Sequence, residues 1–135
     1  MYRSIMDAQM LPHERTAADA ITAAAKDVAT TIGAAAIITY TSSGSTALKA
    51  SRERPDVPVL CLTSNENTMR RCSLAYGIRA AQLPELKTFS ETVEHATRMA
   101  GHLGVAQKGE SLVITAGVPF GTSGSTNILR IARVD

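Results

Sequence analysis

The chain has 135 residues, of which 44% are hydrophobic and 19% are charged, and its formal net charge is +2. This length and composition predict one globular domain with a substantial core. So small a net charge, with aromatic residues at 4%, argues against nucleic-acid binding, and no apolar run reaches the length of a membrane span. The N-terminus lacks the apolar stretch of a signal peptide, and with two cysteines the expected compartment is a reducing cytoplasm.

Residues 1–13 are expected to form a lead-in helix or a linker. Apolar residues from Tyr2 to Met10 recur at roughly helical spacing, and Pro12 ends the pattern. The segment is interpreted either as the cut end of a longer protein or as a frayed terminal helix.

An amphipathic helix is expected next. Thr16 is a suitable N-cap, Asp19 follows it at the third position of the helix, and Gly33 is a suitable C-cap. The stripe predicted to face the core consists of Ile21, Ala24, Ala25, Val28 and Ile32.

The rest of the chain alternates between short apolar runs and helical segments. Cys61 and Cys72 fall in these segments as small buried residues. The pattern predicts a three-layer α/β/α open sheet, mainly parallel, with five strands in the order 3-2-1-4-5 and the fifth antiparallel at the edge. Strands are predicted at residues 35–40, 59–62, 78–81, 111–116 and 127–134, and helices up to about residue 54 and at residues 65–76 and 87–103.

Two similar hydroxyl-rich turns follow the first and fourth predicted strands. Residues 41–46 read TSSGST, and residues 121–126 read GTSGST. The strand order reverses between these two strands, and open α/β sheets bind ligands at such a switch point. Unpaired N–H groups, the dipole of the following helix and the hydroxyls together suit a phosphate. The structural alternative is that both segments are simple capping turns.

The pattern favours a binding module over an enzyme. The three-glycine dinucleotide fingerprint and the P-loop motif are absent, and no metal-ligand set or nucleophile emerges. Lys49, one turn into the helix after the first loop, either reaches a phosphate or is solvated. His95 and His102 are one heptad apart and are interpreted as surface residues, and carboxylates such as Glu66 as solvated.

Several stretches resemble the C-terminal domain of pyruvate kinase of the bacterial type. The resemblance covers about residues 14–135, in order and at the right spacing. The stretches that carry it are residues 34–47 (AAAIITYTSSGSTA), 52–55 (RERP), 59–63 (VLCLT) and 108–127 (KGESLVITAGVPFGTSGSTN).

This resemblance implies a regulatory and oligomerisation domain that binds a phosphorylated effector and forms part of a tetramer in the full enzyme. The full enzyme transfers a phosphoryl group from phosphoenolpyruvate to ADP in glycolysis. It does so with Mg²⁺ and K⁺ in a catalytic TIM barrel that this chain lacks, so no cofactor is expected in this domain.

The resemblance also implies the site residues. The loop after the first strand would hold the effector phosphate through Thr41, Ser42, Ser43, Gly44, Ser45 and Thr46. The loop after the fourth strand would close on the effector through Gly117, Val118, Pro119, Phe120, Gly121, Thr122, Ser123 and Gly124.

Two positions depart from the pattern of members regulated by fructose bisphosphate. Ser45 and, approximately, Thr92 stand where those members carry a basic residue for the second phosphate. A sugar monophosphate or AMP is therefore favoured over fructose bisphosphate, and loss of regulation stays open. The alternatives are a purely structural oligomerisation module and a stand-alone phosphosugar enzyme such as an isomerase, which would need Glu66 or His102 beside the loops.

Overall fold

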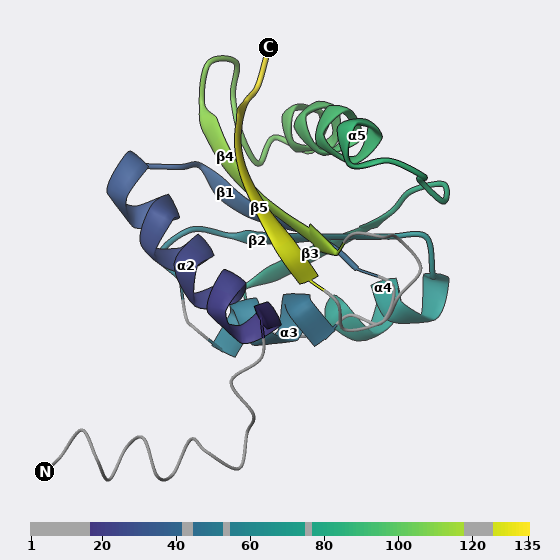
Figure 1. The fold of residues 1–135 in the computed structure, drawn as a ribbon. Helices are drawn as coiled ribbons and strands as arrows, with labels where there is room; N and C mark the ends of the chain where they lie inside the picture. The colour runs from purple at the N-terminus through teal and green to yellow at the C-terminus, as the bar shows by residue number, and fades with distance from the viewer. Residues whose placement is uncertain (1–16, 42–44, 53–54, 75–76, 118–125) are drawn as a thin grey trace, which may run out of the picture.

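The computed structural model describes residues 17–41, 45–52, 55–74, 77–117 and 126–135, which form an open sheet with helices on both faces (Figure 1). The predicted lead-in segment and the predicted cap at Thr16 lie outside these residues. In chain order the elements are α2 (Ala17–Ile32), β1 (Ala36–Tyr40), α3 (Ser45–Arg52), β2 (Val59–Thr63), α4 (Glu66–Cys72), β3 (Ile78–Gln82), α5 (Phe89–His102), β4 (Ser111–Gly117) and β5 (Thr126–Arg133).

The sheet has five strands in the order β3-β2-β1-β4-β5, which confirms the predicted fold class. Strand β1 lies at the centre and pairs in parallel with β2 and β4, so that Thr39 is opposite both Cys61 and Thr115. Strand β5 pairs with β4 in the antiparallel direction at the edge, with Ser111 opposite Arg133. The order follows from right-handed crossovers between parallel strands, and β5 is the next described element after β4.

Each face of the sheet has its own hydrophobic core. Helix α5 covers one face, and α2, α3 and α4 cover the other (Figure 1). The helices on the second face contribute mainly alanine, which lets them approach the strands closely. The strand residues in the α5 core are Ala36, Ile38, Leu60, Leu62, Leu112 and Ile114, and those in the other core are Ile37, Val59, Cys61, Ile78 and Val113.

The buried stripe of α2 differs from the predicted one. Of the predicted residues, only Ala25 is fully buried, whereas Ile21 and Val28 are half-buried and Ile32 is 39% exposed. The small side chains of the helix face the sheet because they allow the closest approach, which leaves the isoleucines at its flank. The residues that α2 buries are Ala18, Thr22, Ala25 and Ala29.

Two helix ends also differ from the prediction. Helix α4 ends at Cys72 rather than near residue 76, because the chain tightens there. The Leu74 N–H donates to the Arg71 carbonyl at 3.3 Å, and the Ser73 hydroxyl donates to the Arg70 carbonyl at 2.7 Å. Helix α5 begins at Phe89, two residues later than predicted, because Thr88 is its N-cap.

Other expectations are confirmed within the described residues. Cys61 and Cys72 are buried, as predicted, and neither is in a disulfide. His102 is exposed and His95 is half-buried, and both contribute to the same side of α5. No helix in the described part of the chain is long and apolar enough to cross a membrane.

Candidate functional site

The strand order reverses between β1 and β4. Residues 36–39 pair with residues 112–115 in parallel register, so the two strands end at the same edge of the sheet. The chain continues from β1 into α3, whereas β4 pairs on its other side with β5. Thr41 and Gly117 follow the paired Thr39 and Thr115 and therefore lie at adjacent strand ends.

The structure locates part of the predicted site at this edge. Thr41 is buried, and its N–H donates to the Leu62 carbonyl at 3.0 Å. Ser45 is the first residue of α3, followed by Thr46, and Gly117 is the last residue of β4. The two predicted loops are thus anchored side by side. Their central residues, namely Ser42, Ser43, Gly44 and Val118 to Gly124, lie outside the described residues.

The start of α3 differs electrostatically from the starts of the other described helices. The first turns of α2, α4 and α5 contain Asp19, Glu66 and Glu91, whereas the first turn of α3 contains no acidic residue. The partial positive charge at the start of α3 is therefore not offset by a carboxylate of its own. This arrangement suits an anion.

Lys49 forms an ion pair that was not considered from the sequence. Its Nζ lies 3.1 Å from Oδ1 of Asp19, and the two side chains are 30% and 35% exposed. The ion pair connects α3 to α2, so the lysine charge is already engaged by a carboxylate. It is therefore a poor candidate for a dedicated phosphate contact.

Buried threonines form a row near the same edge, which the sequence analysis missed. Thr39, Thr115 and Thr63 are all at most 1% exposed. Among the described residues, the hydroxyls of Thr39 and Thr115 have no hydrogen-bond partner of ordinary geometry. The Thr63 hydroxyl instead accepts from the Asn65 N–H at 3.1 Å. The available signal was the recurrence of threonine near the end of three predicted strands.

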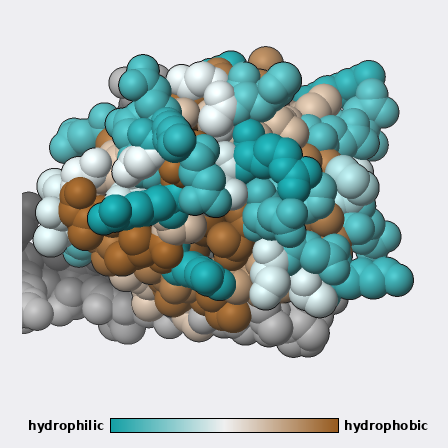
Figure 2. All heavy atoms as spheres, turned by 90° about the horizontal axis from the view of Figure 1, so that it is seen from above, coloured by the Kyte–Doolittle hydropathy of each residue, from teal (hydrophilic) through white to brown (hydrophobic). Residues whose placement is uncertain are grey.

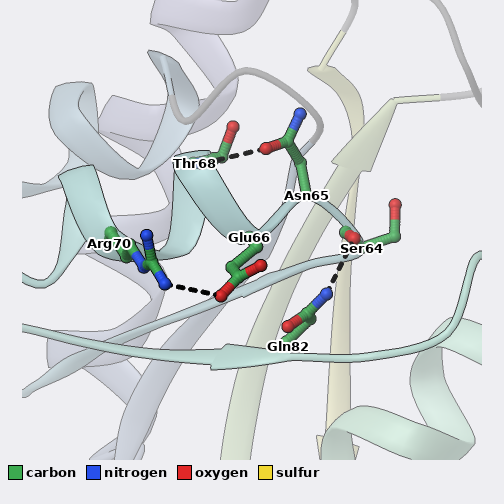
Figure 3. Close-up of polar contacts among 6 residues, drawn as sticks. All are labelled: Ser64, Asn65, Glu66, Thr68, Arg70 and Gln82. Carbon is green, nitrogen blue, oxygen red and sulfur yellow. Dashed lines mark hydrogen bonds and ion pairs between the residues drawn. The ribbon is translucent and has the colours of Figure 1, made fainter.

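The ends of β2 and β3 extend this polar edge (Figure 3). The Gln82 Nε2 donates to the Ser64 carbonyl at 3.2 Å, and Oδ1 of Asn65 accepts from the Thr68 N–H at 3.1 Å. Beside these contacts lies an open depression of about 500 Å³, lined by Ser64, Gln82, Leu83, Pro84 and Glu85. No sequence pattern groups these residues, because they come from two separate strand ends.

Thr92 is excluded from direct contact with a ligand. Its side chain is completely buried on the inner side of α5, together with Ala96 and Ala100, and its hydroxyl donates to the Thr88 carbonyl at 3.1 Å. Only a rearrangement of α5 would expose it.

The residues considered for an isomerase are not brought together. Glu66 forms an ion pair with Arg70 at 2.7 Å on the exposed side of α4. His102 lies in the last turn of α5, next to Leu103, whose carbonyl accepts from Arg79 near the start of β3. His102 is therefore near the amino ends of the strands, opposite the candidate site. Within the described part of the chain, no cluster of three His, Cys, Asp or Glu residues could hold a metal ion.

This fold and the anchoring of both loops at the switch point define an open, mainly parallel α/β domain. The family model described as "Pyruvate kinase, alpha/beta domain" matches residues 19–132. The chain therefore belongs to the family of pyruvate kinase alpha/beta domains.

Similar curated proteins are themselves named pyruvate kinase. The chain is 39% identical over 132 residues to the protein from Agrobacterium vitis and 37% identical over 134 residues to that from Methylorubrum extorquens. It is 35% identical over 130 residues to the protein from Geobacillus stearothermophilus. These alignments cover 98%, 99% and 96% of this chain, but only 28%, 28% and 22% of the relatives. The chain thus spans about a quarter of their length.

Proposed function

We propose that this chain is the regulatory and oligomerisation domain of a pyruvate kinase, which acts in the cytoplasm. The full enzyme would transfer a phosphoryl group from phosphoenolpyruvate to ADP in glycolysis. Its Mg²⁺ and K⁺ would belong to the catalytic barrel, which lies outside this chain. Family membership and the partial coverage of the relatives support this assignment.

The proposed regulatory ligand is a phosphorylated small molecule held at residues 41–46 and covered by residues 117–124. One observation carries this proposal. Helix α3 starts at the strand-order switch point, and its first turn lacks the acidic residue found in the other described helices. Backbone N–H groups at such a helix start attract a phosphate, and a ligand that orders both loops would favour one conformation of the domain.

A single phosphate is favoured over two. Ser45 is uncharged, Thr92 is on the buried side of α5, and Lys49 is paired with Asp19. A second phosphate would therefore find no available cation among these positions. The proposed effector class is a sugar monophosphate or AMP, rather than fructose bisphosphate.

Self-association is the second part of the proposal, and its support is an apolar strip along one edge of the molecule. Hydrophobic side chains gather on the face shown in Figure 2. We define the apolar strip as Ile32 of α2 together with Leu129 and Ile131 of β5. Ile32 is 39% exposed, Ile131 is 50% exposed, and Leu129 is half-buried. Helix α2 packs against β5, so these side chains belong to one surface. A second copy of the chain is the proposed partner, because an edge strand can be covered by its own equivalent.

A thermal-shift titration of the 135-residue chain tests the effector proposal. Glucose 6-phosphate, ribose 5-phosphate, AMP and fructose bisphosphate are compared at equal concentrations. We expect a monophosphate to raise Tm by several degrees, because a hundredfold excess over Kd stabilises the folded state by about 2.7 kcal/mol. No shift with any of the four would refute effector binding, and a much larger shift with fructose bisphosphate would refute the single-phosphate site.

Alanine substitutions inside and beside the proposed phosphate loop show where the ligand that raises Tm binds. The Ser45→Ala and Thr46→Ala double variant is expected to lose most of the shift, because both hydroxyls belong to the proposed phosphate loop. Ser64→Ala, at the neighbouring end of β2, is the control and is expected to keep it. An equal loss in both variants would contradict the proposed position of the ligand.

A further inference from the structure

The two cysteines of the chain contact each other across a helix–sheet interface. Cys61 lies in the middle of β2, and Cys72 is the last residue of α4. Neither is in a disulfide; they are 0% and 1% exposed and belong to the same hydrophobic core. The Cys72 side chain is a hydrogen-bond partner of the Cys61 thiol, so the two sulfur atoms face each other.

The surroundings of Cys61 hold its thiol in the protonated form. Burial raises the pKa of the thiol well above its ordinary value of 9.0, and Cys72 raises it further through charge repulsion and the hydrogen bond. A contact with the Thr39 hydroxyl lowers the pKa in part. Cys61 is consequently a weak nucleophile while the fold is intact.

We propose that Cys61 and Cys72 form an oxidation site, at which a peroxide converts the two facing thiols into a reversible disulfide between β2 and α4. The Cys72 sulfur attacks a peroxide oxygen, the O–O bond breaks, one water leaves, and Cys72 becomes a sulfenic acid. The Cys61 sulfur then attacks the Cys72 sulfur, and the second water leaves as the S–S bond forms. The sulfurs lose two electrons, the peroxide gains them, and the two thiol protons are carried away in the waters.

Local opening of α4 gives the peroxide access to Cys72 first. Helix α4 has only seven residues, and Cys72 is followed by the exposed Ser73 and by Leu74, which is 88% exposed. Short helices open at their ends at low cost. Cys61 is less accessible, because β2 is paired on both sides, with β1 and with β3. Cys72 therefore reacts with the peroxide, and Cys61 resolves the sulfenic acid.

Intact-mass measurement of the 135-residue chain tests the site. The chain is treated with hydrogen peroxide, its remaining thiols are alkylated, and its mass is measured with and without dithiothreitol. We expect both thiols to be lost, the mass to fall by about 2 Da, and dithiothreitol to reverse both changes. Cys61→Ser is the control, in which Cys72 gains oxygen, about 16 Da per atom, instead. Oxygen addition without the 2 Da loss in the unsubstituted chain, or a disulfide-linked pair of chains, would overturn the proposal.

Helix-cap variants test the route through α4. Asn65→Ala removes the side chain that accepts from the Thr68 N–H at the start of α4. Loss of this N-cap hydrogen bond makes local opening of α4 about fivefold more frequent. The disulfide is therefore expected to form about fivefold faster. Thr88→Ala removes the equivalent cap of α5 on the other face of the sheet and is expected to leave the rate unchanged. Equal rates in the two variants would overturn the opening step.

Discussion

Two buried hydroxyls near the ends of the central strands affect the free energy of unfolding. Thr39 and Thr115 lie opposite each other on β1 and β4, and their hydroxyls have no partner of ordinary geometry in the described part of the chain. Thr115→Val is expected to raise the free energy of unfolding by about 1 kcal/mol, because a buried unsatisfied hydroxyl is replaced by a methyl of the same shape. Urea unfolding measures the change.

Thr63 supplies the matched control. It is equally buried, but its hydroxyl accepts from the Asn65 N–H. Thr63→Val is therefore expected to lower the free energy of unfolding by about 1 kcal/mol. If Thr115→Val destabilises the chain as much as Thr63→Val, the Thr115 hydroxyl has a partner in solution and the expectation is wrong.

For single residues, the sequence predicted the place in the fold better than the contacts of the side chain. Thr41 could be placed at a strand end because an apolar run stops there, and Cys61 could be placed in the core because it interrupts no apolar pattern. The engagement of Lys49 by Asp19 could not be predicted, since it depends on how α2 packs against α3. The same holds for Thr92, whose burial follows from the rotation of α5 about its axis. The effector-site assignment itself stays a prediction.

At the scale of elements, the strip formed by α2 and β5 leads to a prediction about assembly. Ile131→Glu is expected to weaken self-association of the 135-residue chain at least tenfold, because a charge on the apolar strip must be desolvated when a second copy covers it. Light scattering after size-exclusion chromatography at several protein concentrations measures the effect.

The control is an exposed leucine outside the strip. Leu74 follows α4 and is 88% exposed, whereas Ile131 is 50% exposed. Leu74→Glu is therefore expected to leave the oligomeric state unchanged. A chain that is already monomeric at high concentration, or that responds equally to both substitutions, would contradict the proposed surface.

Strand assignments were more reliable than helix faces for a physical reason. The predicted strands at residues 35–40, 59–62 and 111–116 were mainly apolar runs, and their register could vary by only a residue or two. The stripe of α2 was ambiguous because alanine, isoleucine and valine occur around much of the helix. The sequence pattern favoured the larger side chains, such as Ile32, whereas close packing on the sheet selected Ala25 and Ala29.

The stability of the whole molecule is expected to fall at alkaline pH through Cys61. Burial raises the pKa of this thiol in the folded state, whereas in the unfolded chain it titrates near its ordinary value of 9.0. Above that pH the unfolded state has lost a proton that the folded state keeps. The free energy of unfolding therefore falls with rising pH, by up to about 1.4 kcal/mol per pH unit from this group, and is unaffected by it below that range.

Cys61→Ala isolates this contribution. The variant loses some core packing at every pH, but its stability should depend less steeply on pH above 9.0. Urea unfolding under reducing conditions, at several pH values on both sides of that point, provides the two slopes. Identical slopes would show that Cys61 does not ionise preferentially in the unfolded chain.

The topology of the whole molecule could be derived from the sequence because few arrangements satisfy right-handed crossovers for this order of elements. The two hydroxyl-rich turns could then be assigned to one edge before any coordinates were considered. What topology cannot supply is the chemistry of the ligand. The choice of ligand depends on which cations are already paired, as Lys49 is with Asp19, and on which side chains are buried, as Thr92 is on the inner side of α5.

Strand β5 takes part in both proposed surfaces. Thr126 pairs with Gly117 at the candidate effector edge, and Ile131, further along the same strand, belongs to the apolar strip. The ladder with β4 joins these two points across a register shift between Ala116 and Gly117, and we expect a displacement at one end to affect the other. Binding equilibria linked in this way are reciprocal. An effector that strengthens self-association must then bind more tightly as the protein is concentrated, and its Kd becomes a function of protein concentration.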